Sequence, residues 1–107
     1  MADQATYFKN IADLQDQIPE DSILSRTFHQ IGGFKAILFG FAAGQQLSEH
    51  TASVPAVIQI LEGEADLILG EDHQEGTAGT WAYMPAELPH SITARTPVTM
   101  LLYLLPG

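Results

Sequence analysis

The sequence predicts an all-β protein, a small sandwich or barrel of antiparallel hairpins. From Ile23 onward the chain is made of short runs rich in Ile, Leu, Val and aromatic residues, which is the composition of strands. Glycine-containing or proline-containing turn signals separate these runs. No helical pattern of ten or more residues lies between them. Short strands punctuated this often, without helices between them, are typical of sandwiches and small barrels.

The expected elements follow one another in a regular order. Six runs are predicted to be strands, at 23–29, 34–41, 55–61, 65–70, 80–84 and 98–105. The segments at 31–33, 42–44, 62–64, 70–76 and 85–89 are predicted to be turns or loops, since they concentrate Gly, Pro and acidic residues. Residues 23–107 are therefore expected to form a single domain.

Residues 1–22 have scattered apolar residues in place of short apolar runs, and they are expected to form an N-terminal arm. Phe8, Ile11, Leu14 and Ile18 are spaced by three and four residues, which predicts a short helix from near Asn10 to Pro19. An extended arm anchored by the same side chains would leave the same pattern, so both alternatives stay open.

The composition limits the classes of function. At 107 residues, with 46% hydrophobic and 16% charged residues, the chain is long enough for one folded core. Thirteen acidic residues against four Lys or Arg give a net charge of −9, which disfavours nucleic acid and anionic membranes as partners. The absence of cysteine excludes disulfides and thiolate chemistry. With no apolar run of about 20 residues and no leader pattern, we expect a cytoplasmic protein.

The last strand bears on assembly. The run at 98–105 is apolar at nearly every position, so both of its faces need cover. A barrel interior covers one face only. A second copy of the chain would cover the other, and we therefore expect a homodimer. The alternative is that residues 1–22 cover the whole outer face.

Two short motifs resemble those of the cupin superfamily. The first has Gly44, five residues and then His50, with Gly63 closing the motif at the family's distance. The second has Gly79 and Pro85 at the family's spacing, followed by His90. Together they cover about half the chain, from position 44 to position 94. The resemblance implies a jelly-roll barrel of the RmlC-like, cupin 2 type, with the N-terminal arm or helix outside it.

The chain departs from the family at its metal ligands. Where the family places a second histidine and a glutamate, this sequence has Ala52 and Ala56. Glu87 and Ala94 replace a glycine and an asparagine of the second motif. The resemblance implies that His50 and His90 project inward near the same end of the barrel, as an incomplete ligand set. Strand alternation turns Gln59 outward, so it is not a convincing substitute.

Three interpretations of the two histidines remain open. They could hold a labile Zn, Ni, Mn or Fe ion, with solvent or substrate completing the coordination. They could serve without metal as hydrogen-bonding or proton-transfer groups, since imidazole changes charge near neutral pH. They could also be a relic pair in a barrel without present chemistry. His29 and His73 are expected to face solvent.

Large side chains near the second motif complete the candidate site. Trp81 and Tyr83 are read either as core residues or as the lining of a ligand cavity, with Phe39 and Met100 as part of its apolar wall. Alanines at positions 52, 56 and 94 predict a roomier, more apolar cavity. The leading hypothesis is a small-molecule-binding cupin in which a divalent metal is optional. The alternatives are a metal-dependent oxygenase, isomerase or lyase and a regulatory or structural dimerisation module. Catalytic residues and enzymatic activity are left undecided.

Overall fold

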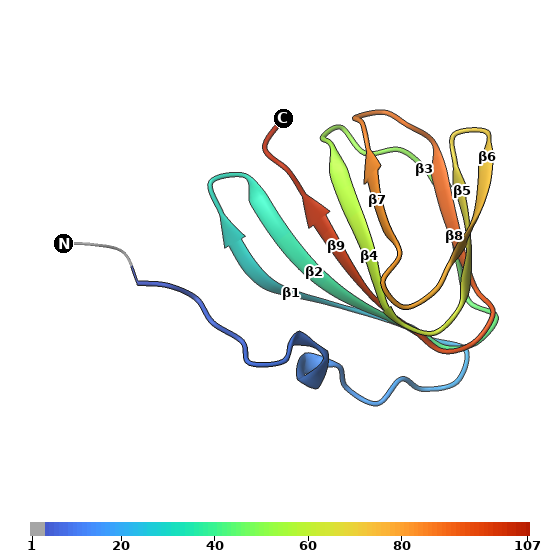
Figure 1. Ribbon diagram of the computed structural model, residues 1–107, viewed down its shortest axis with the longest axis horizontal. Coiled ribbons are helices and arrows are strands. Elements are labelled where there is room, and N and C mark those ends of the chain that lie inside the picture. Colours follow the sequence, from blue (N-terminus) through green and yellow to red (C-terminus); the bar gives the residue numbers. More distant parts are fainter. Residues whose placement is uncertain (1–3) are drawn as a thin grey trace.

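The computed structural model describes residues 4–107. In this part of the chain nine strands form two antiparallel sheets, which face each other as the two layers of a jelly roll (Figure 1). The five-stranded sheet has the order β1-β2-β9-β4-β7, and the four-stranded sheet has the order β3-β8-β5-β6. The strands are β1 (Ile23–Ile31), β2 (Phe34–Phe41), β3 (Gln46–His50), β4 (Ala56–Glu62), β5 (Ala65–Leu69), β6 (Asp72–Gly76), β7 (Trp81–Met84), β8 (His90–Ala94) and β9 (Val98–Leu104).

The all-β prediction is confirmed, and the six predicted strands appear close to their expected bounds. Three further strands, β3, β6 and β8, were not predicted. The segment 70–76, predicted as a turn, contains only a short turn before β6. Every residue of β6 except Gly76 is exposed, so this edge strand carries polar side chains and lacks the apolar pattern of a buried strand.

The core lies between the two sheets. Alternation along β4 turns Ile58 and Ile60 inward, where both are fully buried. Leu67 and Ile92 of the facing sheet pack in the same cluster, as does Met100 of β9. One face of each sheet is therefore covered by the other sheet.

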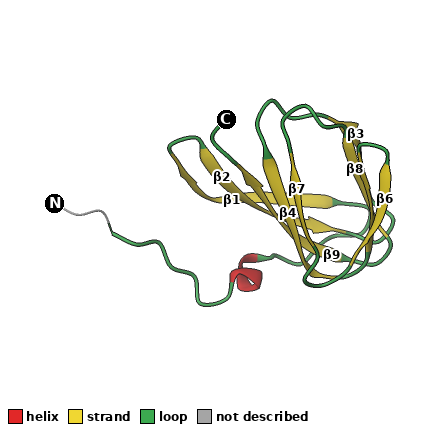
Figure 2. Ribbon diagram, turned by 45° about the horizontal axis from the view of Figure 1, so that its top comes forward, coloured by secondary structure: helices red, strands yellow, loops and turns green. Residues whose placement is uncertain are grey.

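The N-terminal segment is an extended arm with a single helical turn, and the helix predicted from Asn10 to Pro19 does not form (Figure 2). Only η1 (Ile11–Leu14) is helical, and the Asn10 side chain caps it by accepting a hydrogen bond from the backbone of Ala12. So short a helix gains little on its own. Contacts with the sheet hold the arm instead: the Arg26 guanidinium donates to the carbonyl of Leu14 at 3.2 Å.

The outer faces of the two sheets differ in polarity. On the four-stranded sheet, Asp66 and Glu75 are paired across β5 and β6, and Arg95 lies 3.4 Å from Asp66. On the five-stranded sheet, apolar side chains continue on the outer face. The arm covers the part of this face near Gly40, because a side chain at Gly40 would meet the Gln15 amide. No helix among residues 4–107 has the length and apolar character needed to span a bilayer.

Candidate functional site

The two histidines of the sequence motifs lie side by side. His50 ends β3 and His90 begins β8, and the two residues are register partners in the four-stranded sheet. Their ring centroids are 4.2 Å apart, with the ring planes inclined by 60°. His90 lies on the same face of β8 as the core residue Ile92, and it is 6% exposed. His50 is exposed at the rim.

Each imidazole is fixed by a backbone carbonyl two residues before it. Nδ1 of His50 lies 2.8 Å from the carbonyl oxygen of Ser48, and Nδ1 of His90 lies 2.9 Å from that of Leu88. A carbonyl oxygen can only accept, so Nδ1 is the protonated nitrogen of each ring. In the neutral form of the pair, both Nε2 atoms then carry free lone pairs.

Neither Nε2 atom has a hydrogen-bond partner within residues 4–107. No buried side-chain nitrogen or oxygen of these residues lacks a partner, so Nε2 of His90 keeps contact with solvent. The pair therefore presents two neighbouring acceptors at one end of the four-stranded sheet, where His50 is exposed. Such a pair can accept from O–H or N–H donors or coordinate a Lewis acid.

A backbone irregularity sets the position of His50. The register of β3 against β8 shifts between Leu47 and His50, which indicates a bulge. Bulges re-aim the side chains that follow them. The loop after His50 is tied to the second motif, because the backbone N–H of Glu87 donates to the carbonyl of Ala52 at 2.8 Å. The sequence contains no signal that would predict this bulge.

The positions that carry metal ligands in the family do not form a ligand set here. Of the two replaced ligand positions, Ala52 lies in the loop after β3 and Ala56 is buried in the hydrophobic core. Within residues 4–107, no three His, Asp or Glu side chains are grouped so that they could hold a metal ion. Metal sites of this kind normally use three or more protein donors. The residues present therefore do not fit the four-ligand site of the family.

The expected roomy cavity is not seen at the alanines. Ala56 is paired with Met84 across β4 and β7, and Met84 and Met100 are both fully buried in the same cluster. Methionine adapts its shape to irregular space. The alanines at 56 and 94 are thus part of the hydrophobic core.

The other candidate residues are distributed over both faces of the five-stranded sheet. Phe39 and Met100 are register partners on the inner face. The ring centroids of Phe39 and Phe41 are 6.0 Å apart. Trp81 and Tyr83 are 60% and 51% exposed on the outer face, so they lie neither in the core nor beside the histidine pair. Met84 is the buried residue of β7, so its face of that strand turns inward and the face of Trp81 and Tyr83 turns outward. In β6 of the other sheet, Gly76 is the buried residue.

The remaining two histidines lie apart from the pair. His73 is exposed in β6, as expected. His29 is only half exposed, because it lies in an aromatic pocket on the outer face of the sheet. No signal in the sequence indicates this pocket, since its wall combines the arm and the β1–β2 hairpin with β9 from the other end of the chain.

Comparisons with known proteins agree with the fold. The sequence matches no protein-family model, and no curated protein matches it. Among solved structures, a cupin superfamily protein from Desulfitobacterium hafniense matches with a TM-score of 0.84 and 26% identity, over 91% of this chain and 88% of that one. An RmlC-like cupin from Desulfovibrio desulfuricans matches with a TM-score of 0.82 and 23% identity, over 96% of this chain and 98% of that one.

A more distant match is the salicylate 1,2-dioxygenase of Pseudaminobacter salicylatoxidans. Its TM-score is 0.74 at 13% identity, and the match covers 86% of this chain but 28% of the dioxygenase. That likeness concerns the fold alone, because different chemistries occur on one fold.

Proposed function

We propose that this chain, which has the fold of the small cupin proteins it resembles, binds a small molecule at the His50–His90 pair without a resident metal. The observation that carries the proposal is the shared tautomer: both Nδ1 atoms are held by backbone carbonyls, which leaves two adjacent Nε2 acceptors. A ligand matched to this pair carries O–H or N–H donors. Its remaining surface would contact the apolar rim around Leu47, Leu69 and Leu88.

A binding experiment tests the proposal. Untagged protein is stripped of metal with a chelator and titrated at pH 8 with acetamidinium, whose two NH2 groups can donate one hydrogen bond to each ring. Acetate, which can only accept at this pH, is the matched control probe. We expect saturable chemical-shift changes around positions 50 and 90 with acetamidinium alone, and their loss in His90→Ala. Equal responses to both probes, or no loss in the variant, would contradict the proposal.

A metal-dependent cupin enzyme is the alternative that the same preparation can test. Zn, Ni, Mn and Fe(II) ions are each added, excess ion is removed, and metal content is measured. We expect well below one ion per chain, because two imidazoles are a weak ligand set. One ion retained per chain, and lost in His50→Ala, would favour the metal enzyme instead.

A second function, self-association as a dimerisation module, is supported by the outer face of the five-stranded sheet. Two register rows cross its centre, and neither contains a carboxylate although the chain has 13 acidic residues. The rows are His29, Ala36, Tyr103, Val57 and Tyr83, and Arg26, Leu38, Leu101, Gln59 and Trp81. The second copy would contact the β4 and β7 end of these rows, Val57, Gln59, Trp81 and Tyr83, which does not line the aromatic pocket beside His29. Two copies of an acidic chain repel each other least through such a face, which fits a two-fold homodimer.

A further inference from the structure

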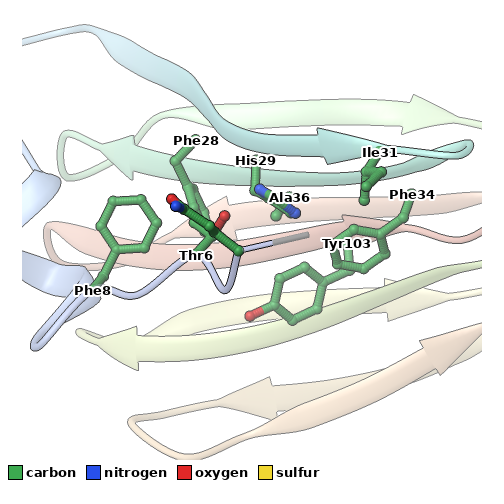
Figure 3. Close-up of a pocket in the computed structure, with 9 residues that line it drawn as sticks. Thr6, Phe8, Phe28, His29, Ile31, Phe34, Ala36 and Tyr103 are labelled. Carbon is green, nitrogen blue, oxygen red and sulfur yellow. The ribbon is translucent and has the colours of Figure 1, made fainter. Parts of the chain in front are cut away.

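A pocket lies on the outer face of the five-stranded sheet, away from the histidine pair. It has a volume of about 350 Å³, within the range of small-molecule sites. The arm forms one wall, and β1, β2 and β9 form the others (Figure 3). The residues that give the pocket its character are Thr6, Phe8, Phe28, His29, Phe34 and Tyr103.

The sheet builds the floor and one wall of this aromatic pocket. Ala36 is flanked in its register row by His29 on β1 and Tyr103 on β9. Its methyl group between two large side chains produces the hollow. Phe34 stacks on Tyr103 with ring centroids 5.6 Å apart and an inclination of 28°, and it lies 6.3 Å from the His29 ring. The hollow therefore follows from the order of large and small residues on the sheet.

The arm supplies the opposite wall. Phe8 meets Phe28 edge to face, with ring centroids 5.6 Å apart and an inclination of 88°. This contact holds the arm against β1, and Phe8 remains 39% exposed. Its neighbour Tyr7 is 78% exposed and does not line the pocket. A molecule in the pocket would thus touch the sheet and the arm together.

The lining selects one ligand chemistry. Aromatic walls favour a planar ring, which can stack or meet them edge to face. No Asp or Glu lines the pocket, so an organic cation would find no carboxylate partner there. The His29 imidazole and the Thr6 hydroxyl can donate hydrogen bonds to oxygen. We propose that this pocket binds a small aromatic molecule with an oxygen substituent, such as a phenol or an aromatic carboxylate.

The experiment is a chemical-shift titration of the full chain with phenol and with benzoate. Cyclohexanecarboxylate has the charge and nearly the size of benzoate but no aromatic face, and is the control probe. We expect saturable shifts at residues 4–8, 28–36 and 103 with both aromatic probes and weaker binding of the control. Phe8→Ala should weaken binding about tenfold, the value of one lost aromatic contact. Tyr7→Ala, at the adjacent exposed position, should leave it unchanged.

A second variant tests the floor of the pocket. Ala36→Leu should fill the hollow and abolish binding. Because Ala36 is buried, this variant is informative only if its spectrum shows the native fold. Phe8→Ala tests the pocket independently of it.

Several outcomes would overturn the proposal. These are no saturable shift with either aromatic probe, equal binding of cyclohexanecarboxylate, or equal losses in Tyr7→Ala and Phe8→Ala. Shifts at positions 50 and 90 with phenol, in place of the pocket, would also overturn it, and would leave the histidine-pair proposal intact because phenol carries an O–H donor. The proposal would also be overturned if the NMR signals of the pocket residues moved with protein concentration alone, since a second copy of the chain would then occupy the pocket.

Discussion

The orientation of His50 and His90 depends on carbonyl groups that no side-chain motif specifies. Each carbonyl belongs to the residue two positions before the ring that it holds, Ser48 and Leu88. Hydrogen bonds of this kind fix the tautomer and the ring plane of an imidazole. The chemistry of the pair therefore depends as much on the backbone around β3 and β8 as on the two histidines themselves.

Glu87 is the residue at which we expect a stabilising substitution. It occupies a glycine position of the second family motif and has a φ of +68°, in the left-handed region that costs other residues about 1–2 kcal/mol. Glu87→Gly should raise the free energy of unfolding by about 1 kcal/mol, after the entropy of glycine in the unfolded chain is subtracted. Urea denaturation measures the change. Glu75→Gly in β6 is the control and should be destabilising; a loss of stability in Glu87→Gly as well would contradict the strain argument.

Two motif glycines with positive φ should respond differently to alanine. A Cβ at Gly63, whose φ is +92°, would overlap the carbonyl oxygen of Pro97, whereas a Cβ at Gly79, whose φ is +96°, would meet open space. We expect Gly63→Ala to cost at least about 3 kcal/mol and Gly79→Ala about 1–2 kcal/mol. Thermal unfolding of the two variants checks the order. Equal costs would mean that the crowding at Gly63 is relieved by a small backbone shift.

At the residue scale, the proximity of the two histidines could be predicted from the sequence, but their tautomer could not. The resemblance implied that His50 and His90 project inward near the same end of the barrel. The structure pairs them on neighbouring strands, with His90 buried and His50 exposed at the rim. The shared tautomer depends on the bulge before His50 and on local carbonyl positions. Neither has a signature in residue type or spacing.

At the scale of elements, the apolar and mixed strands were predictable and the polar ones were not. β4 and β9 are buried on at least one face along their whole length, so their composition is unmistakable. In β3 and β6 most residues are exposed, and in β8 a histidine, a serine and a threonine interrupt the apolar pattern. For the arm, a short helix and an extended segment both fitted the spacing of its apolar residues, and the structure has the extended segment with one helical turn.

Strand β4 offers a test of the alternation that places the core. Ile58 is fully buried between the sheets, whereas its neighbour Gln59 lies on the outer face in the row of Trp81. Ile58→Ala should cost about 2–5 kcal/mol, the range for removing a large core side chain. Gln59→Ala should cost less than about 0.5 kcal/mol. Equal costs in chemical denaturation would show that β4 is shifted by one residue, since such a slip exchanges the two faces.

The whole molecule combines one polar outer face with one apolar outer face, and this asymmetry leads to a prediction about assembly. We expect a homodimer through the β4 and β7 part of the outer face of the five-stranded sheet, outside the aromatic pocket. Each copy carries a charge of −9, so added salt should screen the repulsion and strengthen association. Sedimentation at low and high salt checks this. Tyr83→Glu should shift the equilibrium to monomer, whereas Gln46→Glu, which adds the same charge to the other sheet, should not. A monomeric wild type at all salt concentrations would contradict the proposed dimer.

The central claim is that His50 and His90 present two free Nε2 acceptors to one ligand. The most direct measurement is the long-range ¹H–¹⁵N correlation spectrum of the histidine side chains in metal-free protein at pH 8, with His50→Gln and His90→Gln for assignment. We predict that both rings are protonated at Nδ1 and that both Nε2 signals move together as acetamidinium is added. A ring protonated at Nε2, or one Nε2 signal moving while the other stays fixed, would contradict the claim.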